Sequence, residues 1–163
     1  MAKFAERTLG RTRAELARVE VLKPGIPQEQ MPSLYAAATS FVLPSRGEGW
    51  GRPHAEAMSM GLPCIATNWS GNTEFMTKDN SLLIDIDGLV EIEEGAFRGH
   101  LWAQPSVAHL RQRMRFVHAH HSEAKLLGLR ARDDMVASYS PATLADSVYE
   151  RLRTLLSGSK TEL

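Results

Sequence analysis

Short apolar segments alternate with helical patterns along most of this sequence, and this alternation restricts the fold more than any other feature. The expected strands lie at residues 19–22, 40–43, 63–67 and 81–86, and the expected helices between them lie at residues 5–20, 28–38 and 53–60. Because each strand is short and nearly continuously apolar, both of its faces must be covered. The pattern therefore predicts an α/β fold with a doubly wound parallel sheet built from right-handed crossovers.

The last clear strand that we expect ends at residue 86, and strand patterns disappear from Pro105 onward. Apolar residues then recur at helical spacing in two groups, Val107, Leu110, Met114 and Val117, and later Leu144, Val148, Leu152 and Leu155. We expect these amphipathic helices to pack on the sheet. Pro141 suits the first position of the last helix, and residues 157–163 have the composition of a flexible tail. We expect residues 1–163 to form a single domain.

The composition, with 43% hydrophobic residues in a chain of 163, is that of a globular domain with a proper core. Because 19 basic residues balance 19 acidic ones, the chain has no general cationic field for nucleic acid or an anionic membrane. No apolar run approaches the roughly 18 residues that a spanning helix needs, and the first residues lack the apolar centre of a signal peptide. We therefore expect a cytoplasmic protein with no membrane span and no nucleic-acid partner.

The loop after residues 40–43 is the first place to look for a ligand site, because ligands of doubly wound folds bind at the carboxyl ends of the strands. Three glycines within residues 47–51 let the backbone bend sharply and approach a ligand, and Pro53 suits the first turn of the next helix. The N-terminus of that helix favours phosphate or pyrophosphate. As a dinucleotide fingerprint the loop is incomplete, because His54 stands where the third glycine belongs.

Two carboxylates flank this helix start. Glu48 precedes the helix, and Glu56 lies about one turn inside it, so both can face one cleft without sharing a hydrogen-bonding position. Carboxylate oxygens accept hydrogen bonds from vicinal hydroxyls, so one residue could hold a sugar ring and the other a ribose. On spacing alone, a second interpretation stays open: Glu48 is a solvated loop residue, and Glu56 complements the first helical turn.

Three segments carry a family resemblance: LYAAA at residues 34–38, FVLPSRGEGWGRPHAEAMSMGLPCIAT at 41–67 and NWSGNTEF at 68–75. They resemble the donor-binding domain of retaining glycosyltransferases of the GT-B fold, particularly glycosyltransferase family 4. The E-x7-E motif of that family is intact at Glu48 and Glu56. The resemblance covers about residues 19–90 well and the C-terminal helices in outline, and it includes strand, loop, helix, strand and loop in order.

The resemblance implies transfer of a sugar from a nucleotide sugar to a hydroxyl acceptor, with retention at the anomeric carbon. It gives Glu48 the catalytic position against the donor sugar hydroxyls and Glu56 the ribose hydroxyls. It implies neither a cofactor nor an obligatory metal, because the helix beginning near Pro53 would stabilise the leaving diphosphate. The loop at residues 23–25 corresponds to the nucleobase neighbourhood. The other donor-binding candidates are Ser45, Gly49, Trp50, Gly51 and Arg52.

The chain departs from this family in length. The family has two Rossmann-like domains with the active site between them, and 163 residues hold only one. The first strand of the donor domain, with its diphosphate-binding Arg and Lys, is expected to be absent, and Arg46 or Arg52 could partly replace that clamp. We expect a fragment or a half that needs a partner, with a sheet edge that a second domain or copy could cover. A non-catalytic nucleotide-sugar-binding or assembly module is the alternative function.

Other candidate sites are weaker. His118, His120 and His121 with Glu123 suggest zinc, but paired cysteines and an H-E-x-x-H arrangement are missing, and histidines at a helix end can simply complement its dipole. The serines at 45 and 70 lack a hydrolase motif, and Cys64 is expected to be a core side chain rather than a nucleophile.

The three tryptophans have different interpretations. Trp50 is expected either to shield the donor site or to pack on the sheet, and Trp69 and Trp102 are expected to be packing residues.

Overall fold

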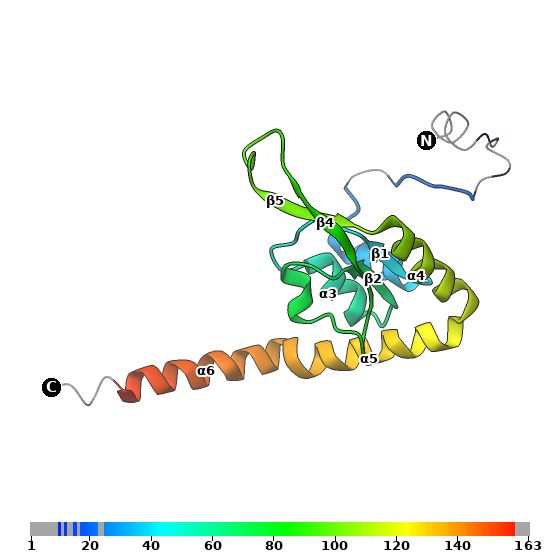
Figure 1. The fold of residues 1–163 in the computed structure, drawn as a ribbon. Helices are drawn as coiled ribbons and strands as arrows, with labels where there is room; N and C mark the ends of the chain where they lie inside the picture. The colour runs from blue at the N-terminus through cyan, green and yellow to red at the C-terminus, as the bar shows by residue number, and fades with distance from the viewer. Residues whose placement is uncertain (1–9, 11, 13–14, 16, 23–24, 159–163) are drawn as a thin grey trace. The chain divides into compact units, whose positions relative to one another are not determined.

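The structure is a computed structural model of the chain, and it describes residues 10, 12, 15, 17–22 and 25–158. The chain divides into two units, Met1–Met31 and Pro32–Leu163, and the second holds the strands and the long helices (Figure 1). The elements are η2 (Gln28–Gln30), α2 (Met31–Ala36), β1 (Phe41–Leu43), α3 (Arg52–Ser59), β2 (Cys64–Thr67), η3 (Gly71–Glu74), β3 (Leu82–Ile84), β4 (Ile86–Glu91), β5 (Leu101–Pro105), α4 (Val107–Ala119), α5 (His121–Tyr139) and α6 (Pro141–Gly158).

Three short strands form a parallel sheet in the order β1-β2-β3. Phe41 of β1 pairs with Cys64 of β2, and Ile65 of β2 pairs with Leu82 of β3. Because β2 is the central strand, all of its residues are buried, and all of them except Thr67 are apolar. The parallel sheet and the C-terminal helices confirm the predicted α/β class.

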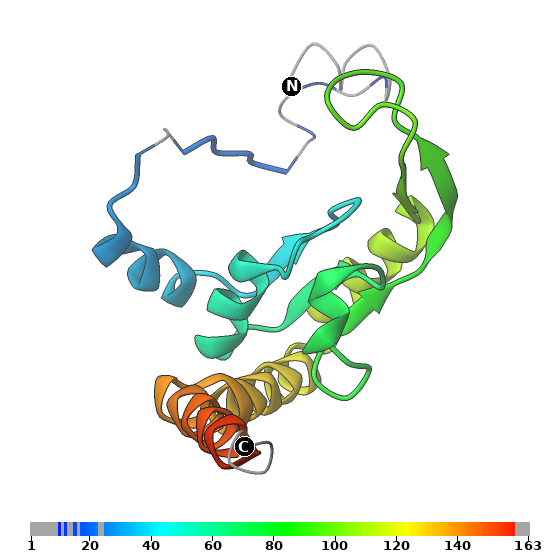
Figure 2. The ribbon, with the colours of Figure 1, turned by 90° about the vertical axis from the view of Figure 1, so that its left-hand side faces the viewer.

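Helices cover both faces of this sheet. Side chains alternate along a strand, so Val42, Ile65 and Leu82 share one face, where they pack with α4 and α5. The core there comprises Ile65, Leu82, Ile84, Val117 and Ala124, with Val42, Leu110, Phe116 and Leu127 against it. On the other face the ring of Phe41 contacts those of Tyr35 in α2 and His54 in α3. Figure 2 shows α2 and α3 on one side of the strands and α4 on the other.

Helix α5 crosses the turn between α3 and β2 at backbone contact distance. A Cβ added at Gly128 would lie 2.3 Å from the carbonyl oxygen of Gly61 and 2.7 Å from the nitrogen of Pro63, so only glycine fits there. Gly61 itself has a φ of +75°, a conformation that suits glycine after a helix end. Nη1 of Arg132 in α5 donates to the carbonyl oxygen of Ser59 at 2.8 Å. Helix α5 therefore fixes where α3 ends and β2 begins.

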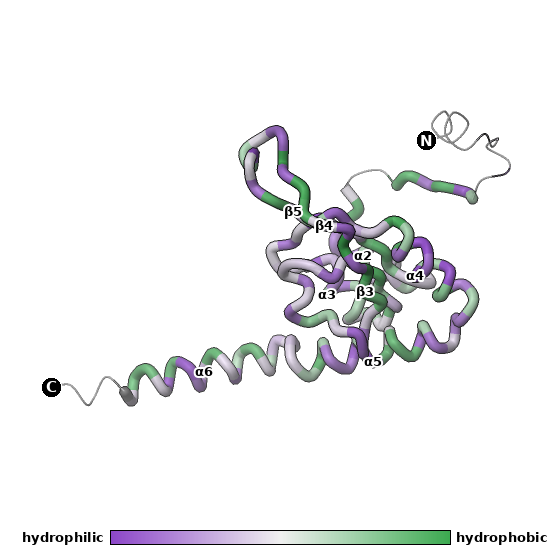
Figure 3. Tube along the Cα trace, viewed as in Figure 1, coloured by the Kyte–Doolittle hydropathy of each residue, from purple (hydrophilic) through white to green (hydrophobic). Residues whose placement is uncertain are grey.

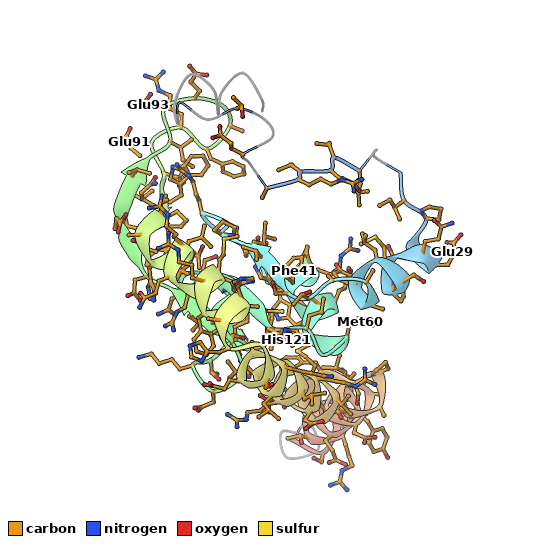
Figure 4. The ribbon with its side chains drawn as sticks, turned by 90° about the vertical axis from the view of Figure 1, so that its right-hand side faces the viewer. Glu29, Phe41, Met60, Glu91, Glu93 and His121 are labelled. Atoms are coloured by element: carbon orange, nitrogen blue, oxygen red, sulfur yellow. The ribbon has the colours of Figure 1, made fainter. Side chains whose placement is uncertain are left out.

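The expectation that residues 81–86 form the last strand was wrong. β3 ends at Ile84, and β4 then pairs antiparallel with β5 in a hairpin. The hairpin was missed because most of β4 is exposed and its pairing shifts between Ile86 and Gly88, so no clear alternation marks it in the sequence. The hairpin projects from the parallel sheet in Figure 1, and Figure 4 shows Glu91 and Glu93 toward its outer end, away from Phe41.

Helix α6 does not pack on the sheet, contrary to the prediction. It begins at Pro141 as expected and continues from the end of α5, and its apolar side chains are exposed, Leu144 at 49%, Val148 at 59%, Leu152 at 54% and Leu155 at 52%. Figure 1 shows α6 extending away from the strands, and Figure 3 shows the apolar positions along it. The spacing identified an amphipathic helix, but spacing does not identify what the helix packs against. None of the described helices combines the length and the apolar character that crossing a membrane requires.

The predictions for the two ends of the chain concern a helix and a strand within residues 5–22 and a tail at residues 157–163. The helix predicted at residues 5–20 lies largely outside the described residues. Residues 17–22 are described and irregular, so the strand predicted at 19–22 is wrong. Val19, Val21 and Leu22 are more than half exposed there and lack the burial that stabilises an apolar strand. At the other end α6 continues through Gly158, and residues 159–163 lie outside the described part of the chain.

Candidate functional site

The glycine-rich loop leaves the carboxyl end of β1 and leads into α3, as the sequence predicts. Gly51 is the residue before α3 and has a φ of +103°, which glycine adopts without strain. A Cβ at Gly51 would also lie 3.0 Å from His54 Nδ1 and 3.0 Å from the Cβ of Asn72. Gly47 and Gly49 have no positive φ, and no atom lies within 4 Å of a Cβ added at Gly49. Of these three glycines, the backbone therefore requires only Gly51.

The N-terminus of α3 has no side-chain cap, and a proline stands in the first turn of the helix. The first N–H groups of a helix have no partner within the helix, and the positive end of the helix dipole lies among them. These donors lie where the loop carrying Glu48 ends, at the carboxyl end of β1. Phosphate is the ligand that such a helix start binds most readily.

Glu56 is half-buried, and both of its carboxylate oxygens have partners. The Tyr35 hydroxyl donates to Oε2 at 2.9 Å, and Oε1 lies 3.3 Å from Nε of Arg52. Arg52 is largely exposed, so this ion pair holds Glu56 weakly, and the tyrosine is the stronger constraint. Burial, and after it the hydrogen bond to Glu56, raises the pKa of Tyr35 to about 12. Tyr35 was missed in the sequence because it lies one helix earlier in the chain.

Glu48 is also half-buried, but here the backbone rather than the carboxylate is held. The Glu48 N–H donates to Oγ of Ser70 at 2.6 Å, and the same hydroxyl donates to the Glu48 carbonyl oxygen at 2.7 Å. The Gly71 N–H donates to that carbonyl oxygen at 3.1 Å. Within the described residues the Glu48 carboxylate has no hydrogen-bonding or ion-pair partner, so it is available to a ligand. This role of Ser70 was not predicted from the sequence, where Ser70 was a candidate only for a nucleophile.

Two buried polar side chains lie behind the loop. His54 and Asn72 are fully buried. His54 Nε2 lies 3.3 Å from the Leu43 carbonyl oxygen, and Nδ2 of Asn72 donates to the Thr67 carbonyl oxygen at 2.9 Å. Each leaves one buried polar atom, His54 Nδ1 and Asn72 Oδ1, without a partner in the described structure. These side chains link α3 and η3 to the ends of β1 and β2, directly beneath Gly51.

The arginine and tryptophan candidates belong to two separate contacts. The Arg46 guanidinium carbon lies 4.9 Å from the Trp102 ring centroid, and the Ala103 N–H donates to the Arg46 carbonyl oxygen at 3.0 Å. The β4–β5 hairpin is thereby attached to the loop just before Glu48. Trp50 packs against Phe75, which follows η3, and against Tyr139 of α5, at 4.7 Å and 5.7 Å between ring centroids.

The remaining predicted residues are a serine at the start of the loop, two tryptophans and the expected nucleobase loop. The Thr67 hydroxyl donates to the Ser45 carbonyl oxygen at 2.6 Å, which fixes the start of the loop to the end of β2. Trp69 and Trp102 are 37% and 36% exposed, so neither is a core side chain. At the expected nucleobase loop, Lys23 and Pro24 lie outside the described residues.

The other chemical candidates do not assemble into a site. Cys64 is fully buried, as predicted for a core side chain, and burial raises the pKa of its thiol to about 12. His120 stacks on Phe116 and lies 3.0 Å from Oε1 of Glu123. The described residues contain no group of three or more histidine, cysteine, aspartate or glutamate side chains that could hold a metal ion. The loop between β1 and α3 is therefore the candidate functional site.

Comparison with known proteins gives a matching family and similar sequences. Residues 3–95 match the family described as glycosyl transferases group 1. The O-antigen chain mannosyltransferase B of Escherichia coli is 54% identical over 43 residues, which cover 26% of this chain and 11% of that protein. The lipopolysaccharide core biosynthesis mannosyltransferase LpsB of Rhizobium meliloti is 35% identical over 69 residues, covering 40% of this chain and 20% of that protein. The chain therefore spans about a fifth or less of each of these relatives.

A solved structure shares the fold. The sucrose-phosphate synthase from Thermosynechococcus elongatus superposes with a TM-score of 0.62 at 22% sequence identity. The superposition covers 82% of this chain and 29% of that protein. At this identity the likeness concerns the arrangement of strands and helices and not the chemistry.

Proposed function

Because this chain belongs to the glycosyl transferases group 1 family, we propose that it binds the donor in the transfer of a sugar from a nucleotide sugar to a hydroxyl acceptor, with retention at the anomeric carbon. The two curated relatives are named as mannosyltransferases, which favours a mannosyl donor. The acceptor in this proposal is a sugar hydroxyl of a growing polysaccharide or lipopolysaccharide, in keeping with those names.

One observation carries the proposal: two carboxylates of the same loop and helix are held in different ways. Glu56 is oriented by Tyr35, whereas the carboxylate of Glu48 has no partner among the described residues and only its backbone is held. We assign Glu48 to the donor sugar hydroxyls next to the reacting carbon and Glu56 to the ribose hydroxyls. Ionised carboxylates accept strong hydrogen bonds from hydroxyls, so each residue selects one end of the nucleotide sugar.

The diphosphate of the donor lies, in this proposal, between those two ends and against the start of α3. The backbone N–H groups near Gly49, Trp50, Gly51 and Arg52 would bind the negative charge that develops as the sugar leaves. Donors already aimed at the developing charge need no reorganisation during the reaction, so a metal is not obligatory in this proposal. Transfer that persists in excess chelator would agree with it, and loss of transfer restored by a divalent cation would contradict it.

The acceptor side of the reaction requires a partner surface in this proposal. Among the described strands β1 pairs only with β2, so its other edge is available to a further domain or to a second copy of the chain. Sedimentation of the purified chain over a range of concentrations tests the second possibility. A mass that stays monomeric at all concentrations would exclude pairing between copies.

The experiment that tests the function is calorimetric titration of the purified chain with nucleoside diphosphates and their sugars, including guanosine diphosphate mannose. We expect saturable binding, and we expect Glu56→Ala to weaken it by about 1–3 kcal/mol because buried hydroxyls lose a charged partner. Glu150→Ala on exposed α6 is the matched control and should bind like the wild type. Absence of binding to every member of the panel by a folded sample would overturn the proposal. Binding without turnover, when acceptors are added, would favour the alternative of a non-catalytic module.

A further inference from the structure

The peptide groups of Glu48 are held by one hydroxyl from a distant loop. Oγ of Ser70 accepts a hydrogen bond from the Glu48 N–H at 2.6 Å and donates one to the Glu48 carbonyl oxygen at 2.7 Å. A hydroxyl can donate one hydrogen bond and can also accept hydrogen bonds, and the Ser70 hydroxyl does both with Glu48. The Gly71 N–H adds a third hydrogen bond, to the Glu48 carbonyl oxygen, at 3.1 Å.

The backbone of Ser70 is in a conformation that serine disfavours. With φ 72° and ψ −159°, Ser70 is the only non-glycine residue of the described chain at positive φ. Glycine would relieve this strain, but it would remove the hydroxyl. Strained residues persist where surrounding contacts fix them, and they gather at functional sites. Ser70 is fixed by the two hydrogen bonds of its hydroxyl with Glu48 and by those that its carbonyl oxygen accepts from Thr73.

The next residue brings the two loops to backbone contact. A Cβ added at Gly71 would lie 2.4 Å from the Gly49 carbonyl oxygen and 2.8 Å from that of Glu48. No side chain therefore separates the Ser70–Gly71 turn from the loop that carries Glu48. The contact sets the backbone on both sides of Glu48 and leaves its carboxylate unpartnered within the described structure.

We propose that Ser70 is a positioning residue that aims the Glu48 carboxylate at the donor sugar, an inference that rests on the function proposed above. Ser70 acts through the backbone of Glu48 and does not touch the donor itself. Its hydroxyl is engaged at both its donor and its acceptor positions, so it does not serve as a nucleophile. Losing it lets the Glu48 peptide groups turn, and the carboxylate then no longer meets the sugar hydroxyls in the right geometry.

This role predicts a selective defect. The nucleoside diphosphate is bound by Glu56 and the start of α3, whereas only the sugar reaches Glu48. Ser70→Ala should therefore weaken binding of the nucleotide sugar by at least about fivefold and leave the nucleoside diphosphate nearly unchanged. A general loss of structure would weaken both ligands alike, so the ratio of the two affinities separates positioning from folding.

The experiment compares variants of the full chain in calorimetric titrations with guanosine diphosphate mannose and guanosine diphosphate, or with the pair that the nucleotide panel selects. Ser70→Ala removes the hydroxyl, and Ser70→Gly removes it while also relieving the strained backbone. Thr73→Val is the matched control: its hydroxyl donates to the Ser70 carbonyl oxygen at 2.7 Å and does not contact Glu48. Glu48→Gln gives the loss expected when the carboxylate itself is changed. Amide hydrogen exchange at Glu48, measured by NMR without ligand, tests the hydrogen bond directly.

The outcomes are distinct. We expect both Ser70 variants, but not Thr73→Val, to lose sugar preference and to exchange the Glu48 amide faster. Unchanged preference in Ser70→Ala and Ser70→Gly would overturn the inference and leave the proposed function intact. Preference lost in Ser70→Ala but kept in Ser70→Gly would also overturn it, because backbone strain and not the hydroxyl would then be responsible. A folded wild-type chain that binds neither ligand would overturn the proposed function. In that case the amide hydrogen exchange still tests the inference: an unchanged exchange rate of the Glu48 amide in Ser70→Ala would show that the Ser70 hydroxyl does not hold Glu48.

Discussion

Gly71→Ala is the substitution that most directly probes how the loop carrying Glu48 is fixed. The added methyl group would lie 2.4 Å from the Gly49 carbonyl oxygen, 2.6 Å from the Gly49 carbonyl carbon and 2.8 Å from the Glu48 carbonyl oxygen. These are backbone atoms, so no side-chain rotation can relieve the overlap. Ordinary contact begins at 3.4 Å, so the two loops must separate by about 1 Å.

That separation determines the expected loss of stability. The hydrogen bonds between the loops now span 2.6, 2.7 and 3.1 Å, and an increase of about 1 Å takes each beyond hydrogen-bonding distance. Overpacking alone costs about 1–3 kcal/mol, and each lost hydrogen bond costs about 1 kcal/mol. Because moving the loops relieves part of the overlap, the terms do not simply add. We expect the free energy of unfolding to fall by about 2–4 kcal/mol.

Urea denaturation followed by circular dichroism measures this difference. Gly49→Ala is the matched control, because it adds the same methyl group to the facing loop, where no atom lies within 4 Å, at a residue without positive φ. We expect Gly49→Ala to unfold within about 0.5 kcal/mol of the wild type. Equal stability of Gly71→Ala and the wild type, or equal losses in the two variants, would refute the close contact between these loops.

Three further predictions follow from packing and ionisation. Gly128→Ala should lower the free energy of unfolding by about 1–3 kcal/mol although alanine is the better helix former, because the methyl group meets the backbone of Gly61; a gain in stability in urea melts would contradict this. Tyr35→Phe should weaken binding of nucleoside diphosphate and nucleotide sugar alike, by about threefold to tenfold in calorimetry, because both carry the ribose assigned to Glu56; a loss confined to the nucleotide sugar would count against that assignment. The pKa values of Cys64 and Tyr35 are raised to about 12 from ordinary values of 9.0 and 10.0, so both groups lose their protons first in the unfolded chain. The contribution of these two groups to stability should therefore be constant below about pH 8 and fall toward pH 12. Cys64→Ala should delay the alkaline fall, and urea midpoints that stay level from about pH 8 to about pH 11 would reject the prediction.

Sequence patterns were sufficient to predict the strands and helices whose residues are buried without interruption or whose ends are marked by proline and glycine. β2 was visible as an apolar run because every one of its residues is buried, and α3 was visible because Pro53 and Gly61 mark its two ends. The β4–β5 hairpin was not visible, because most of β4 faces solvent and carries no alternating pattern. The partner of α6 was not predictable either, since amphipathic spacing gives the apolar face of a helix and nothing about its neighbour.

In the candidate site, too, some features could be predicted from the sequence and others could not. The spacing of Glu48 and Glu56 and the glycines between them could be seen in the sequence, because loop and helix are local structure. The groups that hold these carboxylates could not, because Tyr35 lies 21 residues before Glu56 and Ser70 lies 22 residues after Glu48. Such contacts depend on the order of the strands in the sheet, which brings the ends of β1 and β2 together. The roles of these residues in donor binding stay predictions until the titrations are made.

The main core combines strands from the middle of the chain with helices that follow them in sequence, and this order matters during synthesis. Ile65, Leu82 and Ile84 form one side of the main core, but Val117 of α4 and Ala124 of α5 form the other. On the ribosome the three parallel strands therefore emerge before the helices that cover them, and their apolar face is open to chaperones or to aggregation during that interval. Release of a truncated chain before α5 is complete would leave that face uncovered. Loss of α6 would not, since its apolar residues take no part in this core.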